Sequence, residues 1–329
     1  MHFGVTQEQR SFAEALDDLL SGTDVPAAAR AWAAGEHESG LALWRRLAEL
    51  GVTGLAVPEE LGGLEASKAD LTVAFEALGR HAVPGPWIES IALAPRLLAG
   101  AGLDTVLEGV AEGTTLVTVA ATVPRALDAD VADELFVLDG TMLSRAELGA
   151  ARTSVDPARR LYDVRPGAYV ATLDRVAVDR ALDGASLAAA ATVLGAGERL
   201  LAESVSYATT RRQFGQLIGE YQALKHLLAD VRVALDFARP LVHLAALGLD
   251  AGVPEAGRDV SAAAVACAEA ARLAARTALQ VHGAIGYTQE CDLSLWLLKV
   301  RALRTAWGTP DHHRRRVLAS LTGPTSARN

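Results

Sequence analysis

The sequence predicts a mainly α-helical protein in which one small β unit separates two helical parts. Three observations support this fold class: helical apolar periodicity up to about residue 113, a change of period at residue 114, and a regular return of apolar positions after residue 221. The chain has 329 residues, of which 50% are hydrophobic, so it can bury a large core. We expect an N-terminal helical domain (1–113), a shortened β domain (114–183) and a C-terminal four-helix bundle (184–329).

The first part alternates amphipathic runs with glycine and proline. The runs QEQRSFAEALDDLL and SGLALWRRLAEL place apolar residues at helical spacing, and GVTGLAVPEELGG and AVPGPW interrupt that spacing. Glycine is conformationally free and proline lacks a backbone N–H donor, so both tend to end helices. We therefore expect several short helices that pack together.

The middle part contains short runs rich in β-branched residues. TTLVTVAATV, ELFVLDGTML, RLYDVR and AYVATLDRVAVD are each bounded by Asp, Gly or Pro, which is typical of strands joined by turns. We expect several strands between Thr114 and Asp183.

The last part is helical and more regular. Two Ala-rich runs, ASLAAAATVLGAGERLLAESVSYA and DVSAAAVACAEAARLAARTALQVHG, flank a run that contains Pro240, which should kink the helix because its ring clashes with the carbonyl one turn back. Alternating spacings of three and four, as in the seam of an antiparallel bundle, separate the apolar positions of that run. These positions are Leu224, Leu228, Val231, Leu235, Ala238, Val242 and Ala245.

Composition excludes several classes of function. The net charge of −9 argues against a nucleic-acid partner, whose phosphates need a concentrated basic face. We see no signal peptide and no apolar window of the ~18 to 20 uninterrupted residues that a bilayer requires, so we expect no membrane span. Cys267 and Cys291 are too few for a disulfide framework or a zinc site, which fits a reducing cytosol. We expect a cytoplasmic protein.

Common catalytic motifs are missing from the sequence. HExxH, CxxC and GxSxG do not occur, and the histidines show no ligand spacing beyond the adjacent pair His312 and His313. Gly195-Ala196-Gly197 lies in a helical pattern with no strand before it, so it does not fit a phosphate-binding loop. We expect no metal site and no dinucleotide fold.

Two stretches contain the candidate functional residues instead. They are YATTRRQFGQLIGEYQALKHLLADV (207–231) and QVHGAIGY (280–287). The first is similar to the Arg-x-x-Phe-Gly segment of the acyl-CoA dehydrogenases with its following glutamine and Leu-Ala-Asp, and the second resembles that family's Gln-x-x-Gly-Gly-x-Gly-Tyr turn. LAELGVTGLAVPEELGG is similar to its first-domain signature. The three motifs keep the family's order and span nearly the whole chain, so the sequence is identified as a member.

The resemblance implies FAD held across a subunit interface. Arg211 is a permanent cation with a planar fork of donors, which suits a pyrophosphate, and we expect it just before a helix start. Gln222 offers a donor and an acceptor, and the glycine of HGAIG lets a backbone approach a ligand closely. The expected cofactor-binding residues are Arg211, Gln213, Phe214, Gln222, Gln280, His282 and Gly283.

The departures from the family concern its catalytic base. The family's Glu-Gly-Thr turn reads Trp307-Gly308-Thr309 here, and an indole cannot accept a proton. The alternative base position falls on Ala185 and Ser186, so we expect no catalytic residue in this chain. The β unit is also shorter than the family's middle domain and lacks the Glu-Pro-x-x-Gly-Ser-Asp segment and the aromatic-threonine element that hold the flavin ring and the thioester.

This pattern resembles the base-lacking subunit of heterotetrameric (α2β2) bacterial acyl-CoA dehydrogenases that act on steroid side-chain CoA thioesters. The resemblance implies a catalytic partner subunit that binds most of the acyl-CoA substrate, and an electron-transfer acceptor. Two alternatives stay open. One is a homodimeric flavoenzyme with a non-standard base such as Glu290 or Asp292, and the other is a non-enzymatic scaffold or binding protein on the same fold.

Overall fold

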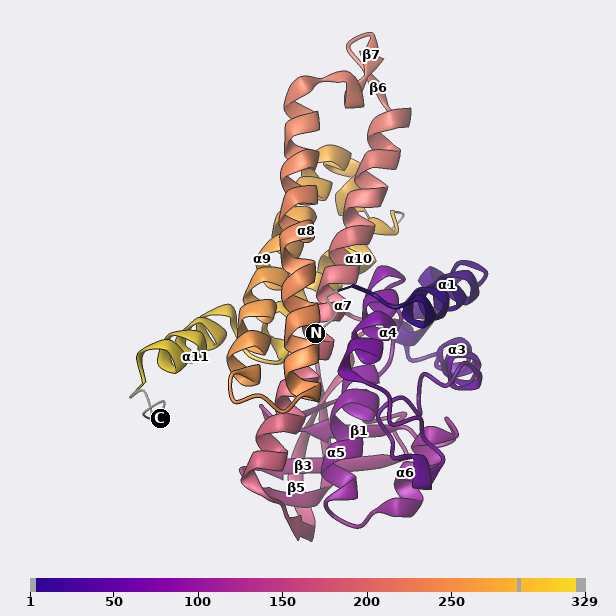
Figure 1. Cartoon of the computed structure of the whole chain (residues 1–329). Helices are drawn as coiled ribbons and strands as arrows, with labels where there is room; N and C mark the ends of the chain where they lie inside the picture. The colour runs from indigo at the N-terminus through magenta and orange to yellow at the C-terminus, as the bar shows by residue number, and fades with distance from the viewer. Residues whose placement is uncertain (1–3, 289–290, 324–329) are drawn as a thin grey trace.

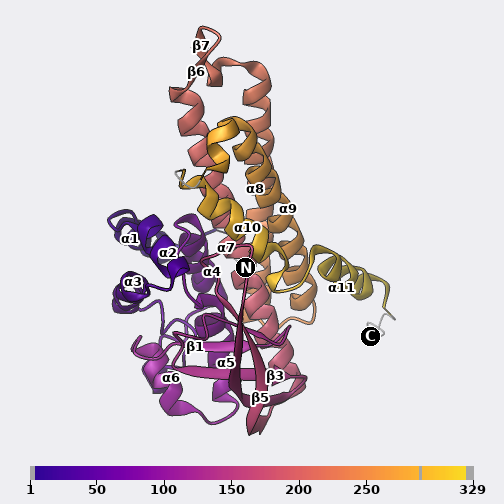
Figure 2. The same cartoon turned by 180° about the vertical axis from the view of Figure 1, so that it is seen from behind.

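The computed structural model describes residues 4–288 and 291–323. It confirms the expected fold class, because helices come first, a small sheet follows and a helical bundle comes last. Figure 1 shows the sheet at one end of the molecule, with the long helices of the bundle rising away from it. Figure 2, seen from behind, shows the first helices gathered along one side of the bundle.

The N-terminal helices begin where the sequence supplies capping side chains. Thr6, Asp24 and Ser67 each accept a hydrogen bond from a backbone N–H in the first turn of the following helix. These bonds satisfy donors that every helix start leaves free. The segments are α1 (Gln7–Ser21), α2 (Val25–Ala34), α3 (Glu38–Glu49), η1 (Glu59–Leu61), α4 (Lys68–Arg80), η2 (Ile88–Leu93), α5 (Ala94–Ala99) and α6 (Asp104–Ala111).

A five-stranded sheet joins the two helical parts in the strand order β1-β3-β4-β5-β2. β1 runs parallel to β3, and the other neighbouring strands are antiparallel. Gly140, with a φ of 61°, makes the turn between β3 and β4. The strands are β1 (Val117–Ala120), β2 (Arg125–Leu127), β3 (Glu134–Asp139), β4 (Met142–Arg152) and β5 (Leu161–Thr172).

The end of the expected β region is helical. The run RVAVD, which we expected to continue a strand, forms the first turns of α7 (Arg175–Thr210). Asp174 causes the change, because its side chain accepts a hydrogen bond from the backbone N–H of Ala177 (2.9 Å) and caps the helix. Val178 and Ala181 then bury their side chains at helical rather than alternating spacing. Residues 175–183 therefore belong to the bundle.

α7 is the central helix of the protein, and it contacts α4, α8, α9 and α10. Gly195 allows α4 to come close, because a Cβ at that position would lie 1.9 Å from the carbonyl oxygen of Glu76. The helical setting of Gly195-Ala196-Gly197 is thus confirmed. By length and hydropathy α7 could span a membrane, which the sequence analysis did not anticipate, but 78% of its most apolar window is buried inside the protein, as in a core helix.

The rest of the bundle folds back along α7. α8 contains Pro240 without ending there, and its expected apolar seam is buried from Val231 to Ala245, whereas Leu224 and Leu228 are only partly buried. The segments are β6 (Arg212–Gln213), β7 (Gln216–Leu217), η3 (Ile218–Glu220), α8 (Gln222–Asp250), α9 (Ala256–His282), η4 (Gly283–Tyr287), α10 (Leu293–Ala306) and α11 (Pro310–Thr322).

The expected position of Arg211 just before a helix start is wrong. Arg211 is the C-cap of α7, and a small β6–β7 hairpin separates it from α8, which begins only at Gln222. The hairpin forms because Phe214 and Gly215 both adopt positive φ, 51° and 85°, as a tight two-residue turn requires. Figure 1 shows this hairpin at the end of the bundle farthest from the sheet.

Candidate functional site

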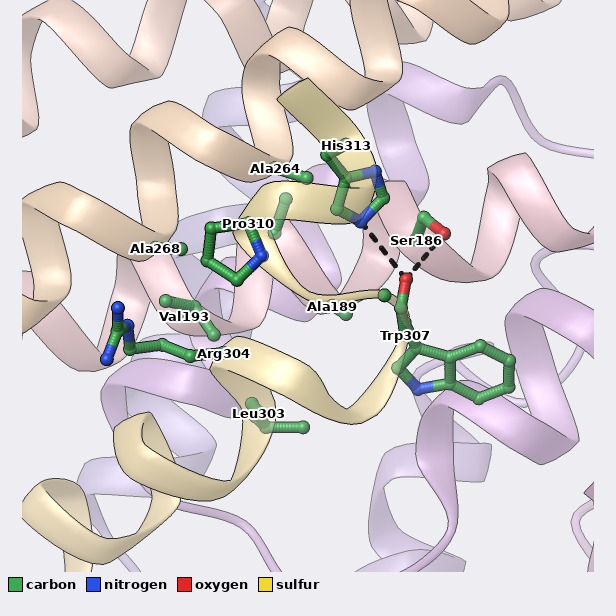
Figure 3. A pocket seen from close by; sticks show the side chains of 12 residues that line it. Ser186, Ala189, Val193, Ala264, Ala268, Leu303, Arg304, Trp307, Pro310 and His313 are labelled. Atoms are coloured by element: carbon green, nitrogen blue, oxygen red, sulfur yellow. Dashed lines mark hydrogen bonds between the residues drawn. The ribbon is translucent and has the colours of Figure 1, made fainter. Parts of the chain in front are cut away.

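The two positions that hold the base in members of the family lie next to each other in this structure. Trp307 ends α10, and Ser186 lies on α7. The hydroxyl of Ser186 donates a hydrogen bond to the carbonyl oxygen of Trp307 (3.3 Å), and Nε2 of His313 on α11 donates to the same oxygen (3.1 Å). Figure 3 shows both bonds, with the indole of Trp307 pointing away from the other two side chains.

The turn after Trp307 is held firmly. Gly308 has a φ of 110°, and a Cβ there would lie 2.6 Å from Nε2 of His313. Thr309 caps α11 by accepting a hydrogen bond from the backbone N–H of His312 (3.1 Å). The turn therefore has a fixed backbone, although its first residue carries an indole instead of a carboxylate.

Neither Ala185 nor His313 supplies a free proton acceptor at this turn. Ala185 is fully buried. Both ring nitrogens of His313 have partners, because Nδ1 lies 3.3 Å from the hydroxyl of Ser261 and Nε2 binds the carbonyl of Trp307. Burial lowers the pKa of His313, which favours its neutral form. The expectation of no catalytic base here stays a prediction.

Of the two alternative carboxylates, only Asp292 is among the described residues. Glu290 falls outside the described residues. Asp292 precedes α10 and forms an ion pair with Arg30. Since a helix rises ~1.5 Å per residue, the 14 residues of α10 place Asp292 about 20 Å from Trp307. Asp292 is therefore a surface ion-pair residue that lies far from Trp307.

The predicted cofactor-binding residues gather at the opposite end of the bundle. Arg211, Gln213 and Phe214 lie at the β6–β7 hairpin, and Gln280 lies in the last turn of α9. Tyr207, one turn before Arg211, stacks on His282 with a ring distance of 4.4 Å, and this contact brings the two segments together. The sequence analysis missed Tyr207, although an aromatic one helical turn before the arginine was visible.

Most of these residues are exposed. Phe214 is 93% exposed, and Arg211 forms no ion pair within the described part of the chain. Gln222 is the first residue of α8, and its amide lies 3.2 Å from Nε2 of His226. His282 differs from the others because it is buried and its Nδ1 donates to the carbonyl of Ala278 (2.8 Å). His282 is therefore better placed to support the loop after α9 than to contact a ligand directly.

Two features make this end suitable for an anionic ligand. The first is the guanidinium of Arg211. Arg211 stands at the C-terminal end of α7, where the helix dipole disfavours an anion. The side chain alone must therefore attract the anionic ligand. Gly283 has a φ of 62°, and a Cβ there would meet no atom within 4 Å, so its backbone faces open space. A ligand could approach that backbone closely.

Comparisons with known proteins identify the family. The model of the acyl-CoA dehydrogenase N-terminal domain matches residues 6–106, and that of the C-terminal domain matches residues 175–322. The chain is 33% identical over 321 residues to the acyl-CoA dehydrogenase IpdE2 of Mycolicibacterium smegmatis, which covers 96% of this chain and 100% of that protein. The chain belongs to the acyl-CoA dehydrogenase family. The recognition made from the motifs is thus confirmed.

Solved structures share the acyl-CoA dehydrogenase fold. The steroid acyl-CoA dehydrogenase Tcur3481-Tcur3483 superimposes with a TM-score of 0.86 at 20% identity, covering 97% of this chain and 98% of that one. The ChsE4-ChsE5 complex of Mycobacterium tuberculosis gives a TM-score of 0.83 at 24% identity, covering 98% and 99%. Both similarities concern the fold.

FAD is the cofactor of acyl-CoA dehydrogenases, and the exposed end of the bundle fits part of it. Arg211 has no ion-pair partner among the described residues, and Gly283 offers an accessible backbone, as the pyrophosphate of FAD would require. The other end of the bundle is different. There the indole of Trp307 is buried beside the sheet, and the family's flavin-ring segment is missing from the sequence. The residues present fit the polar half of FAD.

Proposed function

We propose that this chain is the base-lacking subunit of a heteromeric, FAD-dependent acyl-CoA dehydrogenase. The observation that carries the proposal is the turn at Trp307, where Ser186 and His313 fix the backbone but the first residue carries an indole instead of a carboxylate. In such an enzyme a carboxylate removes the α-proton of the acyl thioester while FAD accepts the β-hydrogen as hydride. A partner subunit would supply that carboxylate and bind most of the substrate.

The role of this chain would be to complete the FAD site across the subunit boundary. Arg211 and Gln213 would contact the pyrophosphate and adenosine portion, and Gln280 and Gly283 would approach the same cofactor from the loop after α9. Gln222, at the start of α8, offers both a hydrogen-bond donor and an acceptor to the edge of the cofactor. His282 would hold the loop through its stacking on Tyr207.

Relatives support a heteromeric assembly and a steroid-derived substrate. IpdE2 is similar over its whole length, and two solved relatives bear paired names, ChsE4-ChsE5 and Tcur3481-Tcur3483, of which the second is called a steroid acyl-CoA dehydrogenase. We therefore propose a steroid side-chain CoA thioester as the substrate, an α2β2 assembly and a cytoplasmic location. Electrons would leave FAD for a separate electron-transfer acceptor.

The test compares the chain alone with the chain co-expressed with a full-length acyl-CoA dehydrogenase encoded beside it. We expect the solitary chain to lack flavin absorbance and to leave a panel of acyl-CoA thioesters unoxidised with a dye acceptor. The co-expressed pair should be yellow and active. Trp307→Glu should not make the solitary chain active, because the flavin-ring segment is also missing. A solitary wild-type chain that binds FAD and turns over would instead indicate a homodimeric enzyme.

We also expect an obligate oligomer. Phe237 and Val233 lie on the outer face of α8 and are 76% and 53% exposed, and Phe214 projects from the hairpin. Permanent complexes cover such apolar side chains with interfaces above ~2,000 Å². Sedimentation of the co-expressed pair should show a stable heterotetramer. A stable, monodisperse monomer that does not associate with the partner would contradict this prediction.

A further inference from the structure

A groove of about 810 Å³ lies between the second half of α9 and α10, two helices that pack side by side in the bundle (Figure 2). Apolar side chains line much of this groove, and the larger ones are only partly buried. They belong to Ala275, Leu279, Leu297, Leu298 and Val300. A continuous apolar surface that faces solvent marks an interaction site more often than a bare surface.

The groove also carries a local excess of positive charge. Its lining includes Arg272, Arg276, Arg301 and Arg304 but no acidic residue of the described chain, although the whole chain has a net charge of −9. Glu269, beside the groove, accepts a hydrogen bond from Nε of Arg272 (2.8 Å) and lies 3.6 Å from Arg304. Arg276 and Arg301 are exposed and form no ion pair within residues 4–288 and 291–323. Two guanidinium groups of the groove are therefore available to a partner.

The basic side of the groove leads to the loop to which we assign FAD contacts. Arg272, Arg276 and Gln280 are four residues apart, so they lie on one face of α9. Gly286, which lines the groove, comes three residues after Gly283. A partner subunit that holds FAD against Gln280 and Gly283 would also cover the groove.

A second copy of this chain would fit the groove poorly. A symmetric contact between two such grooves would bring Arg276 and Arg301 of both copies together, and like charges that lose their water repel each other strongly. An acidic segment of a different chain would pair with the same arginines, while its apolar side chains cover the leucines. The groove therefore opposes self-association at this face and favours a different subunit.

We propose that this groove binds an acidic, partly apolar segment of the catalytic partner subunit, and that its arginines favour the mixed assembly over a homodimer. The inference rests on the proposed function and adds the surface and the charge of the partner. Carboxylates of that segment accept hydrogen bonds from Arg276 and Arg301, which need not break an ion pair of their own. Its apolar side chains cover Leu297 and Leu298.

Co-expression of the full-length chain with the full-length acyl-CoA dehydrogenase encoded beside it tests the proposal, with association measured by sedimentation. We expect Arg276→Glu and Arg301→Glu each to weaken the association by about 10-fold or more, because each replaces a charge-assisted pair by repulsion. Arg276→Lys should keep most of the association, since it keeps the charge. Arg45→Glu is the matched control, because Arg45 is an exposed arginine of α3 outside the groove, and it should associate like wild type.

The possible failures are distinguishable. If the wild-type chain and Arg276→Glu associate equally with the partner, the groove is not the docking site, and the proposed function still stands. If the wild-type chain does not associate with the partner at all, both proposals are wrong. A solitary wild-type dimer that Arg276→Glu disrupts would assign the groove to a second copy and overturn the proposal. Normal association with a lower ratio of flavin to protein would also overturn it, because the arginines would then bind the phosphates of FAD.

Discussion

Arg211→Ala is expected to weaken FAD binding by the assembled enzyme by roughly 10- to 100-fold, because a charge-assisted hydrogen bond to phosphate contributes about 1.5 to 3 kcal/mol. The side chain is exposed at the C-terminal end of α7, where no helix dipole assists it, so the guanidinium carries the whole attraction. The mutant complex should assemble normally and lose its flavin on dilution. The ratio of flavin to protein after gel filtration measures the loss.

Two further variants sharpen this experiment. Arg211→Lys should recover part of the binding, since an ammonium supplies charge without the planar fork of donors. Arg212→Ala is the matched control, because Arg212 is the next residue and is also exposed, and its loss should change flavin content by no more than about twofold. If Arg211→Ala keeps a full complement of FAD and normal turnover, the role assigned to the hairpin end is wrong.

Gly195→Ala should lower the free energy of unfolding by about 2 kcal/mol or more. The new methyl carbon would lie 1.9 Å from the carbonyl oxygen of Glu76, so α4 and α7 must move apart. Alanine has a higher helix propensity than glycine by about 1 kcal/mol, but overpacking costs about 1 to 3 kcal/mol and more against a rigid backbone. The cost of overpacking exceeds the gain in helix propensity here, because the atom that the new methyl group would meet belongs to the main chain. The midpoint of denaturant unfolding checks the result.

Gly184→Ala is a control on the same helix. Its Cβ would come no nearer than 3.7 Å to the carbonyl oxygen of Ala92, an ordinary contact. Only the propensity term remains, so Gly184→Ala should be neutral or stabilising by up to about 1 kcal/mol. Equal effects of the two substitutions would show that the close approach of α4 and α7 does not limit stability.

Local patterns predicted the helices well where their period is long and regular. The apolar seam of α8 and the Ala-rich runs of α7 and α9 are visible because a helix repeats its buried face every three to four residues. Short segments were harder to predict. RVAVD has the alternation of a strand, but the cap at Asp174 and the burial of Val178 inside the bundle make it helical. Tertiary packing overrides such a weak local preference.

The hairpin after Arg211 shows a second limit of sequence patterns. Phe214 adopts a positive φ, which is uncommon for a bulky residue, so the sequence did not suggest a two-residue turn at that point. The motif itself was recognised, but its backbone was expected as a helix start. As a result, the helix-dipole argument for Arg211 was wrong, while the argument from its guanidinium remains.

The sequence by itself determined the family, the order of helices and sheet, and the Trp-Gly-Thr reading of the turn at residue 307, because these follow from residue identity and local spacing. Only the tertiary structure decided which distant residues meet. Ser186 reaches the carbonyl of Trp307 across 121 residues, and Glu89 enters a cleft with Arg301 although more than half of the chain separates them. The physical reason is that such meetings depend on how whole helices and the sheet pack, and no local period encodes that packing.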